Sequence, residues 1–257
     1  MAIKAVTDFT VVDNTVFGNY QNKLVLQADV EILPVSPGQF ANIEIPGNKE
    51  VFLRRPFSIF DFDLACRTIT ILVKELGKGS HTLARVKKGT KLSLVYPLGK
   101  GFSFPLKEDK VLAVGGGSGV APLLFLASKS GLKASQIDIL LGAKSAADHI
   151  PMDTFTAYAN VHFTTEDGTL GETGLVTSHS LFADLSGYNK IYCCGPLPMM
   201  KAVASIARAN QIFCEVSLEN LMACGFGVCL CCIEPTVKGN LTVCTEGPVF
   251  NINDLLW

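Results

Sequence analysis

The sequence predicts a protein of three parts: an antiparallel β-barrel over residues 1–104, an α/β domain with a parallel sheet over 105–213, and a small cysteine-rich subdomain over 214–257. Three observations lead to this prediction. Short alternating apolar and polar runs, separated by turn signals, fill the first part and are typical of a small barrel or sandwich. Strand patterns alternate with helix patterns in the second part, which indicates a parallel sheet covered on both faces. In the third part, five of the nine cysteines fall between Cys224 and Cys244.

Composition and charge exclude several classes of protein. The chain has 257 residues with 22 Lys and Arg against 23 Asp and Glu, so it lacks the basic excess of a nucleic-acid binder. An apolar content of 48% against 18% charged residues excludes intrinsic disorder. The N-terminus lacks the apolar stretch of a signal peptide, and the longest uncharged run, Val111–Ser128, is broken by glycines and Pro122. We expect a soluble, cytoplasmic protein that binds neither nucleic acid nor membrane.

The barrel strands are expected in four runs that alternate with period two and are separated by glycine-rich turns. A short helix is expected at Ser80–Val86, with Ser80 as its N-cap, because a serine oxygen can accept a hydrogen bond from the first turn of a helix. The four runs are LVLQADVEI, FANIEI, TITILV and KLSLVY.

The α/β domain begins with the buried-strand pattern Val111–Val114, followed by a glycine-rich turn and the helical run VAPLLFLAS. A second helix is expected at KAVASIARAN. The further strands are expected at IDILLGA, VHFTTED, KIYCCG and IFCEVS.

The glycine-rich turn at 115–119 is a candidate phosphate site. Backbone N–H groups and the helix dipole favour an anion there, and the missing Cβ atoms let a pyrophosphate approach closely. The pattern departs from G-x-G-x-x-G because Val120 holds the third glycine's place. The next strand ends in Gly142–Ser145 without the acid that would bind a ribose hydroxyl. A tight turn without a ligand is the alternative interpretation.

A second candidate follows a later strand, at Cys193-Cys194-Gly195-Pro196. The carboxyl end of a parallel strand is where open α/β sheets bind ligands, and a small thiol there leaves room for a nicotinamide ring. A buried core cysteine is the alternative. The predicted nucleotide-binding residues are Gly115, Gly116, Gly117, Ser118, Gly119, Cys194, Gly195 and Pro196.

A third candidate lies within the barrel, at Arg55-Pro56-Phe57-Ser58. A guanidinium suits a pyrophosphate, an aromatic ring packs on a flat ring system, and a hydroxyl can hydrogen-bond a ring nitrogen. Gly79-Ser80 at the start of the short helix offers another anion site. Each has an ordinary alternative: a surface arginine, a core phenylalanine and a helix cap.

The cysteine spacing is the most specific signal. An odd, clustered set in a chain without a secretory signal favours metal ligation over disulfides. Cys224, Cys229, Cys232 and Cys244 give C-x4-C-x2-C-x11-C, and its first spacings match the plant-type [2Fe–2S] pattern. Cys231 leaves C-x6-C as a second possible spacing, and four thiolates around one Zn²⁺ are the alternative site.

In this order, RPFS, GKGSHT, GGGSGVAP and CGP resemble the ferredoxin–NADP⁺ reductase superfamily, in which a flavin-binding barrel precedes a pyridine-nucleotide domain. The resemblance covers essentially the whole chain. One departure is Phe57, where many members have tyrosine, so that ring stacking is kept and a phenolic hydrogen bond is lost. The residues that the resemblance assigns to FAD are Arg55, Pro56, Phe57, Ser58, Leu72, Val73, Lys74, Gly79 and Ser80.

The cysteine-rich tail resembles, more narrowly, the electron transfer subunits of dihydroorotate dehydrogenase B. That resemblance implies a [2Fe–2S] cluster on Cys224, Cys229, Cys232 and Cys244. It also implies an FMN-containing catalytic partner that oxidises dihydroorotate in pyrimidine biosynthesis, and a heterotetramer with two copies of each subunit. Only this resemblance favours NAD(H) over NADPH, because Lys144 could also meet a 2′-phosphate.

These parts together predict an electron relay. Nicotinamide exchanges two electrons as a hydride, a [2Fe–2S] cluster takes one at a time, and a flavin can do both. The four histidines are scattered and form no Ser–His–acid constellation, so no acid–base catalytic residue is expected. Two other functions remain open: a reductase subunit of another complex, of hydrogenase, sulfur reductase or ferredoxin reductase type, and a zinc-stabilised nucleotide-sensing module without flavin.

Overall fold

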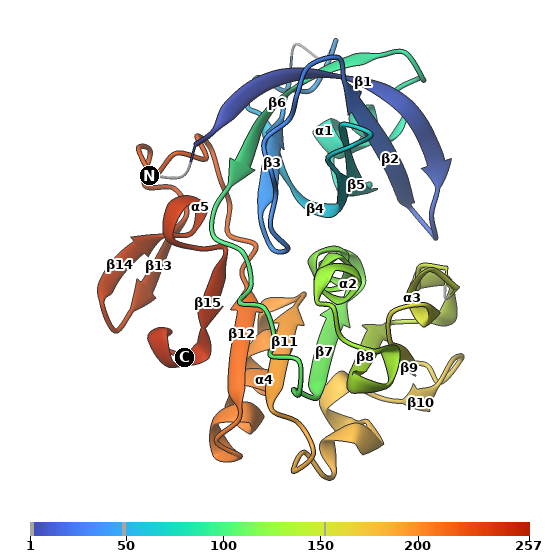
Figure 1. The fold of residues 1–257 in the computed structure, drawn as a ribbon, viewed down its shortest axis with the longest axis vertical. Helices are drawn as coiled ribbons and strands as arrows, with labels where there is room; N and C mark the ends of the chain where they lie inside the picture. The colour runs from blue at the N-terminus through green and yellow to red at the C-terminus, as the bar shows by residue number, and fades with distance from the viewer. Residues whose placement is uncertain (1–2, 48–49, 152) are drawn as a thin grey trace.

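A computed structural model describes residues 3–47, 50–151 and 153–257. It confirms the predicted fold class: a closed antiparallel barrel, a sheet of mainly parallel strands, and a small cysteine-rich tail (Figure 1). The barrel and the sheet are stacked along the long axis of the molecule, and the tail lies beside both of them. None of the helices in the described ranges is long and apolar enough to cross a membrane.

The barrel closes through six strands in the order β1-β2-β5-β4-β3-β6. Alternation along β2 turns Leu24 and Leu26 inward, where they pack with Ile69 and Ile71 of the neighbouring strand. Closure leaves no unpaired edge strand, so every strand has hydrogen-bonded neighbours on both sides. The strands are β1 (Ala5–Val16), β2 (Gln21–Ala28), β3 (Phe40–Ile43), β4 (Arg55–Asp63), β5 (Thr68–Lys74) and β6 (Lys91–Leu98).

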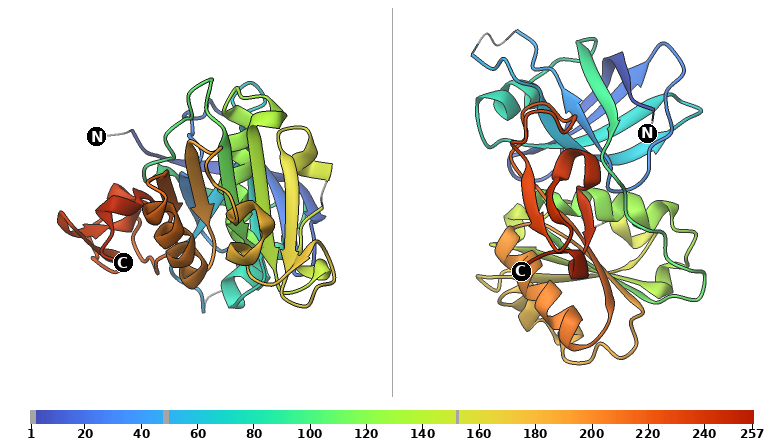
Figure 2. Two further views of the ribbon diagram at one scale, coloured as in Figure 1. Left: turned by 90° about the horizontal axis from the view of Figure 1, so that it is seen from below. Right: turned by 90° about the vertical axis from the view of Figure 1, so that its left-hand side faces the viewer.

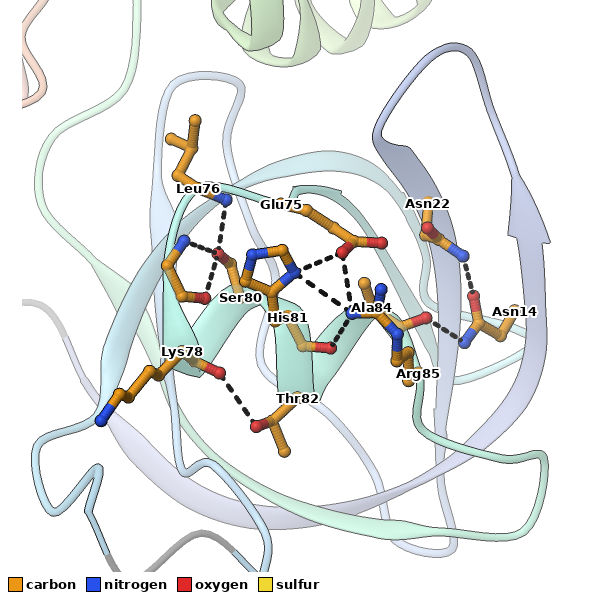
Figure 3. A network of polar contacts seen from close by, with 11 residues as sticks. Asn14, Asn22, Glu75, Leu76, Lys78, Ser80, His81, Thr82, Ala84 and Arg85 are labelled. Atoms are coloured by element: carbon orange, nitrogen blue, oxygen red, sulfur yellow. Dashed lines mark hydrogen bonds and ion pairs between the residues drawn. The ribbon is translucent and has the colours of Figure 1, made fainter.

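The short barrel helix α1 (Lys78–Ala84) forms as expected, but its predicted N-cap is wrong. The cap is Gly77, and Ser80 lies one turn into the helix. Its Oγ reaches back to accept hydrogen bonds from the N–H groups of Leu76 (2.8 Å) and Gly77 (3.0 Å), as Figure 3 shows. A serine at the cap and a serine three residues inside the helix both accept hydrogen bonds from backbone N–H groups at the helix start, although from different ones, so sequence alone does not distinguish the two positions.

The second sheet has the order β10-β9-β8-β7-β11-β12-β15. All neighbours are parallel except β15, which pairs antiparallel with β12. Helix α2 faces the barrel and shares one apolar cluster with Phe17, Phe60 and Leu72, whereas α4 packs on the opposite face. The elements up to β12 are β7 (Val111–Gly116), η1 (Gly117–Gly119), α2 (Val120–Lys129), β8 (Ile137–Ala143), α3 (Asp153–Thr156), β9 (Asn160–Thr165), β10 (Glu172–Thr173), β11 (Lys190–Cys194), α4 (Leu197–Ala209) and β12 (Phe213–Ser217).

The tail has no separate core and packs on the rest of the molecule (Figure 2). Cys232, Val243 and Cys244 join the apolar cluster that includes Val216 of β12 and Phe40 of β3. The tail is too short to bury a core of its own, so contact with the sheet edge and the barrel wall stabilises it. Its elements are β13 (Ile233–Thr236), β14 (Gly239–Thr242), α5 (Val243–Glu246) and β15 (Val249–Asn251).

The end of the chain is fixed to α4 by one arginine. Arg208 donates to the carbonyl oxygens of Trp257 (2.6 Å), Leu255 (3.3 Å) and Ile252. The predicted boundary between residues 213 and 214 falls inside β12, and β15 returns to the same sheet. The division into domains therefore stays a prediction.

Asp138, near the start of β8, is a buried carboxylate with several donors. It accepts hydrogen bonds from His162 Nε2 (2.9 Å), Tyr188 OH (2.9 Å) and Asn160 Nδ2 (3.2 Å). Burial raises the pKa of Asp138, but these donors outweigh burial and hold it below the ordinary value of 3.8. The charged form is therefore favoured by folding.

This arrangement predicts a specific pH dependence of stability. Because the pKa of Asp138 is lowered on folding, its contribution is present above the unfolded value and is lost as the pH falls through the folded one. We expect Asp138→Asn to lower the free energy of unfolding by about 1–3 kcal/mol at neutral pH and to flatten its decline below pH 3.8. Urea unfolding at a series of pH values measures both effects. An unchanged acid slope in the variant would contradict the prediction.

Candidate functional site

A first cavity lies between the barrel and the sheet. It has a volume of about 190 Å³ and is lined by residues from all three parts of the chain. The barrel side consists of predicted flavin-binding residues at the ends of β4 and β5, where the strand pairing brings two distant motifs together. The lining residues are Phe40, Pro56, Phe57, Ser58, Leu72, Lys74, Leu76, Ser118, Ala121, Leu218, Glu219, Asn220, Met222 and Pro248.

The predicted phosphate-binding residues of the barrel lie next to each other. A Cβ atom on Gly79 would be 3.3 Å from Arg55 Nε, so α1 begins directly against the Arg55 side chain. The neighbouring Arg54 has a different role, because it donates to the Ser93 carbonyl oxygen at 2.5 Å and fixes the strand. Val73 points into the barrel core, so only its main chain can face a ligand.

Glu75 connects this phosphate region to the body of α1. Its Oε2 lies 2.5 Å from His81 Nδ1 and 2.8 Å from Arg85 NH1 (Figure 3). Hydrogen bonding from His81, and then from Arg85, lowers the pKa of Glu75 against the opposite effect of burial. The helix start at Gly79 and Ser80 is thereby held by side chains as well as by the backbone.

The tail contributes residues to this cavity that the sequence analysis missed: Glu219, Asn220 and Met222. Glu219 is exposed on the cavity wall, where partial desolvation by the surrounding protein raises its pKa and Lys74 acts in the opposite direction. Asn220 Nδ2 donates to Glu234 Oε2 at 3.0 Å. No local pattern marks these residues, because they become neighbours of the barrel only after the tail folds back.

The second cavity has a volume of about 490 Å³ and adjoins the first, because Lys74 lines both. Gly116, Gly117 and Pro196 form one wall, as predicted for the nucleotide site. A Cβ atom on Gly117 would lie 3.5 Å from Lys74 Nζ, so a barrel cation reaches the glycine-rich turn. Ser118 faces the first cavity instead.

The two nucleotide-binding motifs pack directly against each other. A Cβ atom on Gly119 would lie 2.4 Å from the Cys194 carbonyl oxygen, and one on Gly116 would lie 2.8 Å from Pro196 Cδ. Gly195 has φ +152°, a conformation that L side chains rarely adopt, and it approaches the Gly116 Cα. These glycines are required by backbone contact whether or not a nucleotide is bound.

The thiols at the end of β11 lie in the core. Cys193 and Cys194 are both fully buried, and burial raises their pKa values well above the ordinary range. Gly115 lies behind the turn, where a Cβ atom would be 3.3 Å from Leu123 and Leu141. A contact of the Cys194 thiol or of Gly115 with a nicotinamide nucleotide stays a prediction.

Two carboxylates line the second cavity where the sequence analysis found no acid. Glu166 follows β9, Asp148 lies beyond the end of β8, and Lys144 lines the same cavity. Ser145 Oγ donates to Asp148 at 3.0 Å, and the N–H of Glu166 donates to the Ala143 carbonyl oxygen at 3.1 Å. Glu166 follows the strand next to β8, so the residues directly after β8 in the sequence do not reveal it.

The four predicted cluster ligands form two pairs. The Cys224 and Cys229 thiols interact with each other, as do those of Cys232 and Cys244. Burial alone would raise the pKa of Cys224, but backbone N–H donors, with Phe226 first among them, lower it to about 6. Cys231 is exposed beside them.

Backbone N–H groups point at the sulfurs, as a loop that wraps an iron–sulfur cluster requires. The N–H of Gly227 donates to Cys244 Sγ at 3.1 Å, and that of Phe226 donates to Cys224 Sγ at 3.3 Å. Gly225 and Gly227 have φ values of +77° and +79°, which give the loop its tight turns.

The donor set fits a [2Fe–2S] cluster. Such a cluster needs two thiolates on each iron, and the folded tail carries Cys224, Cys229, Cys232 and Cys244 as free thiols. Backbone N–H groups face Cys224 Sγ and Cys244 Sγ, as the cluster requires.

Comparison with known proteins gives one consistent result. Residues 219–256 match the family model described as the iron–sulfur cluster binding domain of dihydroorotate dehydrogenase B. The electron transfer subunit of dihydroorotate dehydrogenase B (NAD(+)) from Shouchella clausii is 34% identical over 255 residues, which is 96% of each chain. Its counterpart from Caldanaerobacter subterraneus is 40% identical over 226 residues, covering 86% of this chain and 87% of that protein.

A solved structure is also similar over the whole chain. An NADH-dependent reduced ferredoxin–NADP oxidoreductase, studied for flavin-based electron bifurcation, superposes with a TM-score of 0.85 at 26% identity. The match covers 100% of this chain and 92% of that one.

Proposed function

The chain belongs to the family of dihydroorotate dehydrogenase B electron transfer subunits, and from this we propose how its residues perform the transfer. The chain carries electrons between NAD(H) and a catalytic dihydroorotate dehydrogenase partner. The observation that carries the proposal is the first cavity, which has walls from the barrel, the glycine-rich turn and the cysteine tail. A flavin bound there would lie within reach of both other centres.

The barrel residues would hold FAD. Phe57 and Leu72 offer apolar surface to the ring system, Ser58 offers a hydroxyl, and Arg55 beside Gly79 provides a site for the pyrophosphate. When bound, FAD converts the two-electron hydride of NAD(H) into the single electrons that a [2Fe–2S] cluster on the thiol pairs accepts. The chain's own contribution is to position these groups and to exclude water.

The second cavity would hold NAD(H). Gly116 and Gly117 allow a pyrophosphate to approach the backbone, and Lys74 lies beside Gly117 to meet its charge. The lining of the same cavity includes Glu166 and Asp148, which suit the hydroxyl groups of a ribose and repel a 2′-phosphate.

This placement predicts a change in nucleotide preference. Glu166→Gln is expected to raise kcat/KM for NADPH relative to NADH about fivefold, corresponding to about 1 kcal/mol of charge repulsion removed. Steady-state reduction of ferricyanide with each nucleotide measures the ratio. Glu108→Gln, at an exposed position outside the cavity, is the control. An unchanged ratio in Glu166→Gln would remove Glu166 from the ribose site.

The partner is proposed to dock over the cysteine loop. Exposed apolar side chains surround it, including Leu221 (85% exposed) and Val228 (81%). Such a patch is typical of a protein–protein contact. We propose an FMN-containing catalytic subunit on this surface, a heterotetramer with two copies of each chain, and a cytoplasmic location.

Co-expression with a candidate dihydroorotate dehydrogenase subunit tests the function. Orotate-linked reduction of NAD⁺ by the co-purified complex is the expected result, with FAD, two irons and two inorganic sulfides per electron transfer subunit. Stoichiometric zinc in place of iron, or a chain prepared without air that holds neither FAD nor cluster, would overturn the proposal.

A second candidate is a reductase subunit of another complex. The whole-chain similarity to the ferredoxin–NADP oxidoreductase structure favours it. Co-purification with a ferredoxin-reducing partner, without orotate-linked activity, would select this second function.

A further inference from the structure

Asn42 is a buried amide at the contact between the barrel and the cysteine loop. It lies on β3 with 1% of its surface exposed. Its Nδ2 donates a long hydrogen bond (3.4 Å) to the carbonyl oxygen of Cys224, the first predicted cluster ligand. Its Oδ1 is buried and accepts no hydrogen bond from any residue that the structure describes.

The cysteine loop is shaped to receive this side chain. A Cβ atom on Gly225 would lie 2.4 Å from Asn42 Nδ2, so only glycine lets the loop approach so closely. Gly225 also has φ +77°, which favours glycine independently. The Asn42 side chain and the Cys224–Gly225 backbone are therefore packed closely, with no room for a larger residue at position 225.

Asn42 lies on the sheet face that carries residues of the proposed flavin cavity. Asn42 pairs with Pro56, and Phe40 pairs with Ser58, in the antiparallel register of β3 and β4. Directly opposed residues of an antiparallel pair have side chains on one face of the sheet. Phe40, Pro56 and Ser58 all line the first cavity, so Asn42 shares a sheet face with cavity residues and also contacts the Cys224 carbonyl oxygen.

Stability does not account for an amide here. All four residues of β3 are buried, and an apolar side chain would fill the position without leaving a carbonyl oxygen unpaired. Asn42 contacts the backbone of a predicted cluster ligand. Its presence is therefore better explained by the position in which it holds that ligand.

We propose that Asn42 is a positioning residue for electron transfer between FAD and the [2Fe–2S] cluster, an inference that rests on the function proposed above. It fixes the Cys224–Gly225 segment against the barrel face that carries Pro56, and so sets the separation of the two centres. Electron transfer depends steeply on that separation. Hydride exchange between NAD(H) in the second cavity and the flavin does not involve the Cys224–Gly225 segment, so it is not expected to depend on Asn42.

The test compares two rates in the full chain loaded with FAD and cluster. Anaerobic mixing with NADH is followed by flavin absorbance for hydride transfer and by freeze-quenched EPR of the reduced cluster for the next step. Asn42→Leu is expected to keep the flavin rate and to slow cluster reduction about 10–100-fold, with wild-type iron and sulfide content and an unfolding temperature at least as high. Asn42→Asp, which places a second oxygen against the Cys224 carbonyl, is expected to slow cluster reduction further.

Gln39→Leu is the matched control. It removes an amide-to-carbonyl bond next to the same strand, from Gln39 Nε2 to the Gly99 carbonyl oxygen (2.8 Å), away from the cysteine loop. It is expected to leave both rates unchanged.

Three results would overturn the inference. Cluster reduction at the wild-type rate in Asn42→Leu would show that the residue does not set the separation. Loss of iron and sulfide from that variant would assign Asn42 to cluster retention instead. Absence of cluster reduction by NADH in the loaded wild-type chain would overturn the proposed function itself, and this inference with it.

Discussion

Replacement of Cys229 by serine is expected to abolish electron transfer to a partner while NADH still reduces the flavin. Cys229 interacts with Cys224 as one of the two thiol pairs, and a serine oxygen does not replace the thiolate that iron requires. The two cavities proposed for FAD and NAD(H) do not include Cys229, so hydride exchange should persist. Diaphorase activity with ferricyanide and orotate-linked NAD⁺ reduction by the complex measure the two steps separately.

Cys231→Ser is the matched control for this prediction. Cys231 is exposed two residues away in the same loop, and it belongs to the alternative C-x6-C spacing. We expect Cys231→Ser to retain two irons, two sulfides and full transfer. The opposite outcome, with cluster loss in Cys231→Ser and a functional cluster in Cys229→Ser, would establish the alternative spacing.

Replacement of Gly119 by alanine is expected to eliminate NADH binding and to destabilise the fold. The added Cβ would lie 2.4 Å from the Cys194 carbonyl oxygen and 2.7 Å from the Gly195 nitrogen, and both are main-chain atoms that cannot rotate away. Forcing the two motifs apart should cost about 1–3 kcal/mol of unfolding free energy and should distort the phosphate site at Gly116 and Gly117. Urea unfolding and the KM for NADH measure the two effects.

Gly187→Ala is the control for this second prediction. A Cβ atom on Gly187 would have no neighbour within 4 Å, and its φ lies outside the left-handed region. Its stability and KM should match those of the wild type. An NADH affinity in Gly119→Ala equal to that of the control would show that the contact with Cys194 and Gly195 is not needed to form the nucleotide site.

The outcomes at individual residues show where sequence reasoning succeeds. Cys224, Cys229 and Cys232 lie within nine residues, and the geometry of one loop brings them together, so spacing alone points to the cluster. Pro56, Phe57 and Ser58 are consecutive on one strand, and all three line the first cavity. Motifs of this kind are readable because the residues that act together are also neighbours in the chain.

The errors and omissions also have physical causes. Ser80 resembles an N-cap because a serine at either position accepts hydrogen bonds from backbone N–H groups at the helix start. Glu166 was missed because it follows the strand beside the one where an acid was sought. No sequence pattern marks Asn42, because its proposed role depends on a contact with Gly225, which lies far away in the sequence.

The sequence by itself determined the order of the parts, many of their strands and helices, and the thiolates that fit an iron–sulfur cluster, because these depend on periodicity and on short spacings. Only the tertiary structure decided that Leu218, Glu219, Asn220 and Met222 of the tail line the barrel cavity, that Lys74 joins the two cavities, and that β15 completes the sheet. These features arise when apolar surfaces from distant segments are buried together. That burial depends on the shape of the whole molecule, and no local pattern records which surfaces will meet.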